Sequence, residues 1–113
     1  MNLLTIPENV QKAAQKAVEL KKLGFKGGMA TGHARAKQLA KGGTIPLKDV
    51  KVMRAWYARH IYSSYPSYTF WVNDGKKTDQ AYKKYGGIYS WLAWGGDPGY
   101  KWVNSTKIGK LLD

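Results

Sequence analysis

The sequence contains no cysteine, which excludes a disulfide scaffold and any zinc site built from thiolates. Its two histidines, His33 and His60, lie far apart and lack the spacing of a metal pair. No apolar run approaches the ~18 residues of a membrane-spanning helix. The first residues also lack the basic and then apolar order of a secretory signal. We therefore expect no metal, no cofactor and no membrane association.

Acidic residues are scarce. Seven Asp and Glu face 19 Lys and Arg, which gives a net charge of +12. Such an excess costs self-repulsion in the folded state, so the charge indicates a polyanionic partner. Nucleic acid, either DNA or RNA, is the first interpretation. An acidic protein surface is the second, and a solubilising surface without a partner is the third.

The 113 residues suit one domain, and five Trp with eight Tyr supply enough large side chains for a core. Apolar spacings of three and four, with Pro at helix starts and Gly after helix ends, predict an all-α domain over 1–113. It would have four or five short helices around a Trp-rich core. Their expected ranges are 7–22, 32–41, 46–62, 87–94 and 99–104. The β-prone aromatic run at 68–72 predicts one short extended segment.

Three motifs occur in order along the chain. Gly32–Leu39 begins with Gly-x-Ala-Arg-Ala, and Val50–His60 ends with aromatic-Ala-Arg-His. In Gly87–Trp102, Ile88, Trp91 and Trp94 precede Gly-Gly-Asp-x-Gly-x-x-Trp. Together they resemble a small accessory module of tailed-bacteriophage proteins.

The resemblance implies a phage protein in the host cytoplasm during infection or in the virion. It implies no firm activity, because the module has none assigned. One position departs from the module. Ile61 follows His60, where the module often has an acid.

The first 59 residues carry most of the basic side chains, set opposite the apolar stripes of the predicted helices. This layout is typical of a surface that contacts phosphates, although any solvated helix face can show it. The expected nucleic-acid-binding residues are Lys12, Lys16, Lys22, Lys26, Arg35, Lys37, Lys41, Lys48, Lys51 and Arg54. We expect helix packing to gather them into one continuous positive patch. Six to eight phosphate contacts would give a log–log salt slope of roughly −5 to −7 on duplex DNA.

The dense turn signal Gly95-Gly96-Asp97 is expected to be structural. His60 would hydrogen-bond this turn, and Asp97 would pair with Arg59 to hold two helices together. The alternative is a nuclease-like or transferase site around His60, but the sequence offers no acidic cluster for Mg²⁺ and no nucleophile beside it. We expect no catalytic residue.

The aromatic cluster Tyr62, Tyr65, Tyr68, Phe70 and Trp71 could stack unpaired bases or pack in a core or interface. The sequence as a whole predicts a non-enzymatic, phage-type nucleic-acid-binding protein. The alternative is a small virion or host-takeover protein that docks on an acidic protein surface through the Tyr-rich segment.

Overall fold

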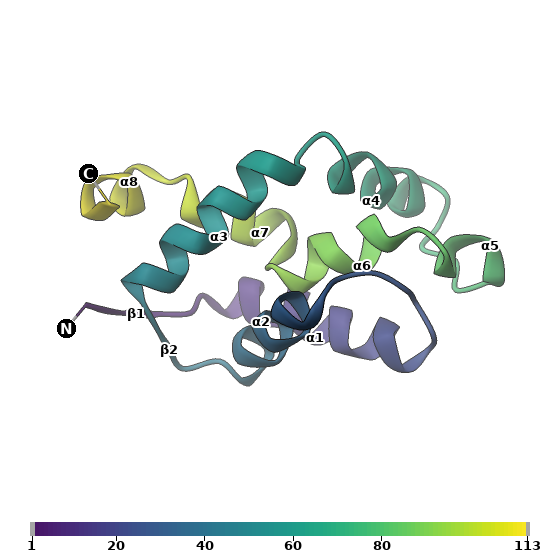
Figure 1. Cartoon of the computed structure of the whole chain (residues 1–113), viewed down its shortest axis with the longest axis horizontal. Helices are drawn as coiled ribbons and strands as arrows, with labels where there is room; N and C mark the ends of the chain where they lie inside the picture. The colour runs from purple at the N-terminus through teal and green to yellow at the C-terminus, as the bar shows by residue number, and fades with distance from the viewer. Residues whose placement is uncertain (1, 113) are drawn as a thin grey trace.

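The computed structural model describes residues 2–112 and is mainly helical (Figure 1). Within those residues its elements are β1 Leu3–Thr5, α1 Glu8–Lys22, α2 Ala30–Lys41, β2 Thr44–Pro46, α3 Leu47–His60, α4 Ser64–Asn73, α5 Gln80–Lys83, α6 Gly86–Ala93, α7 Gly96–Val103 and α8 Thr106–Leu112. The predicted all-α class with a Trp-rich core is confirmed. The five predicted helices all occur, with ends shifted by up to three residues, and α4, α5 and α8 are additional.

The two short strands fix the beginning of the described chain against α3. They pair antiparallel, with Leu4 opposite Ile45. The ladder continues when Ile6 N–H donates to the Gly43 carbonyl at 2.8 Å and Leu47 N–H donates to the Asn2 carbonyl at 2.9 Å. The strands thus place the first described residues beside the start of α3, and α8 lies at the same end of the molecule (Figure 1).

Helix α6 is the centre of the fold, with α1 and α2 on one side and α4 on another (Figure 1). Its Trp91 is 1% exposed and contacts the rings of Tyr57, Tyr65 and Tyr100 at centroid distances of 5.0, 4.7 and 5.9 Å. Aromatic pairs at these separations add to the stability that burial gives. Helices from distant parts of the sequence are thus joined through one indole.

The prediction of an extended segment at 68–72 is wrong, because these residues lie within α4. Tyr65, Tyr68 and Trp71 recur every three residues, so a helix places them on one face against the core. Trp71 is 1% exposed, meets Phe25 edge-on at 6.0 Å and donates its indole N–H to the Lys77 carbonyl at 2.7 Å. Packing of this face outweighs the β propensity of the individual residues.

The Gly95-Gly96-Asp97 segment joins α6 to α7, with Gly96 and Asp97 forming the start of α7. Both glycines have positive φ, 120° and 65°, which strains any residue with a Cβ. The partners differ from those expected. The buried Tyr57 hydroxyl lies 2.9 Å from the Trp94 carbonyl and 2.8 Å from the Gly96 carbonyl, while Asp97 accepts the Trp91 indole N–H at 2.8 Å.

His60 and Arg59 are therefore wrong as turn partners. His60 instead stacks on Trp56, with ring centroids 4.7 Å apart and planes 22° apart, and Arg59 is exposed. The side chain that reaches the turn comes from Tyr57, on the inner face of α3. Burial, with a smaller effect of the Asp97 charge, raises the pKa of Tyr57 well above its usual value, so the hydroxyl keeps its proton for these carbonyls.

Candidate nucleic-acid interface

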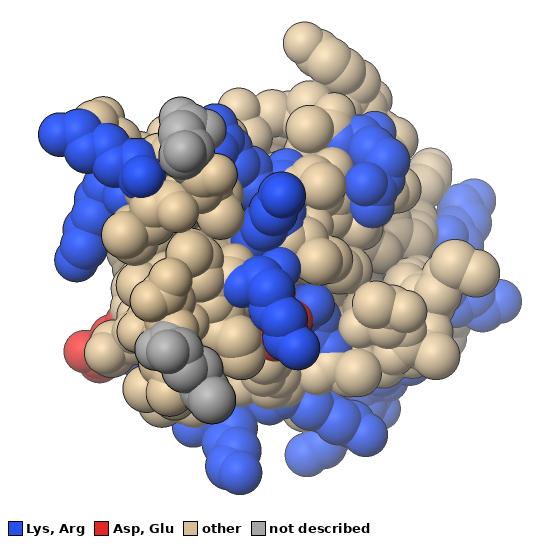
Figure 2. Space-filling view, turned by 60° about the vertical axis from the view of Figure 1, so that its left-hand side comes forward, with Lys and Arg blue, Asp and Glu red and all other residues tan. Residues whose placement is uncertain are grey.

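The basic side chains do not form one continuous patch on the face that Figure 2 shows. Lys and Arg appear around its outline and in its middle, with other residues between them and few acidic atoms. Ion pairs within residues 2–112 involve only Lys12, Lys16, Arg35 and Lys77, so most of the 19 cations have no carboxylate partner there. A candidate site must therefore be sought where individual cations converge.

Two of the predicted phosphate contacts are paired on the exposed face of α1. Lys12 lies 3.2 Å from Glu8, and Lys16 lies 3.3 Å from Glu19. Exposed pairs such as these contribute well under about 1 kcal/mol to stability. They do place a negative charge beside each ammonium group, which weakens the local potential.

Arg35 is a structural cation rather than a surface one. Its side chain is 11% exposed and lies 3.5 Å from the Asp49 carboxylate, so it joins α2 to α3. It also donates to Gln38 at 2.5 Å, and its guanidinium carbon lies 5.3 Å from the Trp94 ring centroid. An arginine held in this way is not available to a phosphate, so we remove it from the expected set.

The remaining cations converge most clearly at a groove between α1 and α2, which we call the lysine groove. It has a volume of about 440 Å³. Its lining residues are Val18, Lys21, Lys22, His33, Ala36, Lys37 and Tyr89, and none of these residues is acidic. Three lysine side chains from two helices thus line one hollow, because α1 and α2 pack side by side.

The floor of the lysine groove carries an ordered polar pair. The Tyr89 hydroxyl lies 2.7 Å from His33 Nδ1, and Lys21 Nζ lies 5.3 Å from the Tyr89 ring centroid. Burial raises the pKa of Tyr89, so its hydroxyl stays protonated and can donate to Nδ1. In a neutral His33 the proton then sits on Nε2, which is a hydrogen-bond donor.

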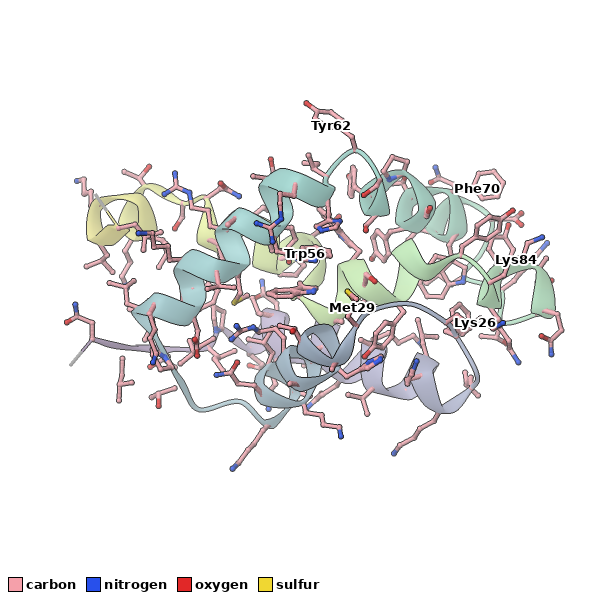
Figure 3. The ribbon with its side chains drawn as sticks, viewed as in Figure 1. Lys26, Met29, Trp56, Tyr62, Phe70 and Lys84 are labelled. Carbon is pink, nitrogen blue, oxygen red and sulfur yellow. The ribbon has the colours of Figure 1, made fainter. Side chains whose placement is uncertain are left out.

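The glycine-rich loop at residues 24–28 follows the C-terminal end of α1 and contacts α5 and α6. Lys26 N–H donates to the Lys83 carbonyl at 2.8 Å, and Gly27 packs on Gly86 so closely that a Cβ at Gly27 would lie 2.3 Å from the Gly86 carbonyl oxygen. Lys26 itself is exposed, and Figure 3 shows it at the α5 end of the molecule, as it does Lys84. The loop therefore extends the positive charge beyond the groove.

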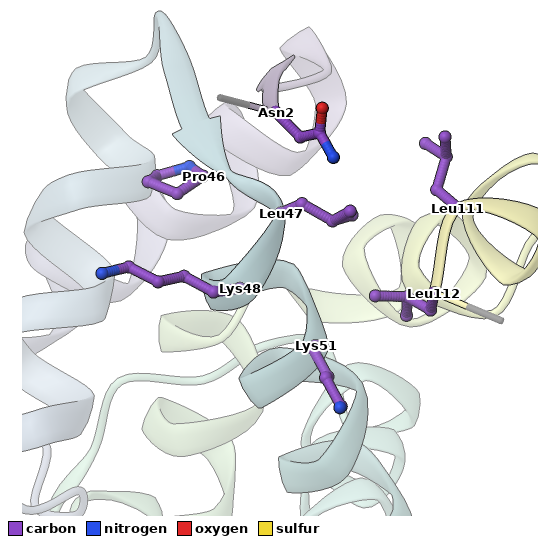
Figure 4. A pocket seen from close by; sticks show the side chains of 7 residues that line it. All are labelled: Asn2, Pro46, Leu47, Lys48, Lys51, Leu111 and Leu112. Carbon is purple, nitrogen blue, oxygen red and sulfur yellow. The ribbon is translucent and has the colours of Figure 1, made fainter.

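The other predicted contacts lie elsewhere. Lys48 and Lys51 line a separate open hollow of about 570 Å³ together with Leu47, Leu111 and Leu112 (Figure 4). Lys41 is exposed at the end of α2, and Arg54 is half-buried on α3. These four do not line the lysine groove. Of the ten predicted residues, the groove includes Lys22 and Lys37, and the structure adds Lys21.

The five aromatic residues at positions 62–71 fall into a buried group and an exposed group. Tyr65, Tyr68 and Trp71 pack on the core. Tyr62 and Phe70 are 91% and 63% exposed and point outward (Figure 3). Only these two remain as candidate surfaces for a base or a protein partner.

The part of the chain that the structure describes holds no cluster of three His, Asp or Glu side chains. None of its helices combines the length and apolar character needed to cross a membrane. No protein-family model, curated protein or solved structure matches this chain.

Proposed function

We propose that this protein is a non-enzymatic, phage-type nucleic-acid-binding protein that grips the phosphate backbone in the lysine groove. The observation that carries the proposal is the convergence of Lys21, Lys22 and Lys37 on one hollow with no acid in its lining. Ammonium groups bind phosphate oxygens as point charges and release condensed counterions from the nucleic acid. A groove with these donors suits a backbone better than it suits a particular base sequence.

Neighbouring groups support the same partner. The groove also holds His33, whose Nδ1 accepts from the Tyr89 hydroxyl and whose Nε2–H can donate to a sugar or phosphate oxygen. Lys26 adds an exposed cation in the adjacent loop. Three or four phosphate contacts follow from this arrangement, fewer than the sequence alone predicts.

The salt dependence of binding tests the proposal. In gel shifts with labelled duplex DNA at several salt concentrations, we expect a log–log slope of about −3, because each phosphate contact contributes roughly −0.9. Single strands of DNA and RNA should give about −2 for the same contacts.

A steeper slope, near −6, would indicate that cations outside the groove also take part. Absence of binding at low salt would overturn the proposal. It would favour instead a protein that docks on an acidic partner, for which the exposed Tyr62 and Phe70 are the anchors to replace first.

A further inference from the structure

A second cavity lies between the first turn of α2 and the outer face of α3 and belongs to no site described above. Its volume is about 430 Å³, within the range of small-molecule pockets. It is lined by Gly28, Met29, Thr31, Gly32, Val52, Trp56, Arg59, His60, Ser64, Ser90 and Trp94. We call it the α2 cavity. Its lining contains a cation, three hydroxyls and no acid.

The first turn of α2 presents unpaired donors to this cavity. Met29 stands at the cap position without a side-chain hydrogen bond, and the first turn contains no acid. The helical hydrogen bonds of α2 begin with His33 N–H donating to the Met29 carbonyl, so the N–H groups of Thr31 and Gly32 have no helical acceptor. Free N–H groups at a helix start favour a bound anion.

Ser64 is an independent indication of a ligand. It lies at the start of α4, is only 6% exposed and lines the cavity. Within residues 2–112, no side-chain hydrogen bond involves the Ser64 hydroxyl. The hydroxyl of the neighbouring Ser63, by contrast, donates to the His60 carbonyl. Gly87 packs on its Cα, where a Cβ at Gly87 would lie 2.9 Å away, so Ser64 is held in place. The residue is thus largely buried, while its unpaired hydroxyl is open to the cavity and can bond a ligand there.

The remaining wall is aromatic and apolar. Trp56 stacks with Trp94 at 5.1 Å and 11°, and with His60 at 4.7 Å and 22°. His60 is half-buried, and burial, followed by the Arg59 charge, lowers its pKa, which keeps the ring neutral at pH 7. Met29 and Val52 add flexible and aliphatic contacts. This wall suits a compact planar group rather than a second charge.

We propose that the α2 cavity binds a phosphate monoester, with its phosphate between the first turn of α2, Arg59 and Ser64, and its organic part against the Trp56–His60 wall. Donors from three elements match a tetrahedral oxyanion better than a planar carboxylate. The monoester can be a free nucleoside monophosphate or the terminal phosphate of a strand. The proposal does not depend on the lysine groove.

Isothermal titration should compare adenosine monophosphate, adenosine and inorganic phosphate with the whole chain. We expect adenosine monophosphate to bind at least about 10-fold more tightly than adenosine, because the phosphate supplies charge-assisted hydrogen bonds. Matched oligonucleotides with a 5′-phosphate or a 5′-hydroxyl identify the source. Preference for the phosphorylated strand over the mononucleotide assigns a strand end, and the reverse assigns a free nucleotide.

Two variants locate the site. Thr31→Asp places a carboxylate at the first turn of α2, where it favours the helix but repels a phosphate, so binding should fall at least about 10-fold while the thermal midpoint holds or rises. Arg59→Gln should weaken binding similarly, whereas Arg54→Gln, also on α3 but outside the cavity, should leave it unchanged. Equal binding of adenosine and its monophosphate, no binding of either at millimolar concentration, or full binding by Thr31→Asp would each overturn the proposal.

Discussion

Replacing Gly99 by alanine is expected to destabilise the protein by about 3 kcal/mol, since overpacking costs about 1–3 kcal/mol and a lost buried hydrogen bond adds about 1 kcal/mol. Gly99 is buried in α7. A Cβ there would lie 2.5 Å from the Tyr57 hydroxyl oxygen and 3.1 Å from the Trp94 carbonyl oxygen. Tyr57 is 0% exposed and cannot swing aside. The hydroxyl would be forced away from the two carbonyls that hold the α6–α7 turn.

The matched control is Gly109→Ala in α8. A Cβ at Gly109 meets nothing within 4 Å, so alanine should leave stability unchanged or raise it by up to about 1 kcal/mol through helix propensity. Urea unfolding of both variants beside the parent chain measures the two changes. Equal stability of the parent chain and Gly99→Ala would show that the Tyr57 hydroxyl does not hold the turn.

The double variant Lys22→Gln, Lys37→Gln is expected to lose nucleic-acid affinity on the order of 100-fold at roughly 50 mM salt and about 10- to 15-fold at roughly 150 mM. Both lysines line the groove, one from α1 and one from α2. Removing two phosphate contacts should also reduce the magnitude of the salt slope by about 2 on duplex DNA. Both lysines are exposed, so the fold should be unaffected.

The control with the same net charge is Lys12→Gln, Lys16→Gln. These cations lie on α1 outside the groove, paired with Glu8 and Glu19. We expect their loss to change affinity by less than about 5-fold, since only the long-range potential changes. Equal losses in the two double variants would mean that total charge, not the groove, determines binding.

Local sequence signals were sufficient for most helices. Pro7 and Pro46 directly precede α1 and α3, and the residues buried in α1, Val10, Ala14, Ala17 and Leu20, recur at helical spacings of three and four. They failed for α4, where the β propensity of single residues concealed the three-residue recurrence of Tyr65, Tyr68 and Trp71. A propensity scale describes single residues and does not include the packing of these rings on α6.

The candidate site depended on contacts that the sequence does not contain. Arg35 has the same local pattern as Lys37, yet its partner Asp49 comes from the next helix. The sequence predicts Lys22 but not Lys21 as a nucleic-acid-binding residue, because only the packing of α1 on α2 brings both to one hollow. Likewise, His60 and Tyr57 lie one helical turn apart, and sequence alone could not tell which of them faces the Gly95–Gly96 turn.

The placement of the tryptophans gives each hollow a different optical signature. Trp56, Trp71, Trp91 and Trp94 are all less than one-tenth exposed, so their emission should be shifted to the blue. Trp56 and Trp94 line the α2 cavity, whereas no indole lines the lysine groove. A ligand in the α2 cavity should therefore change the emission of Trp56 and Trp94, whereas a polyanion held only by the three lysines should leave these two indoles as they were.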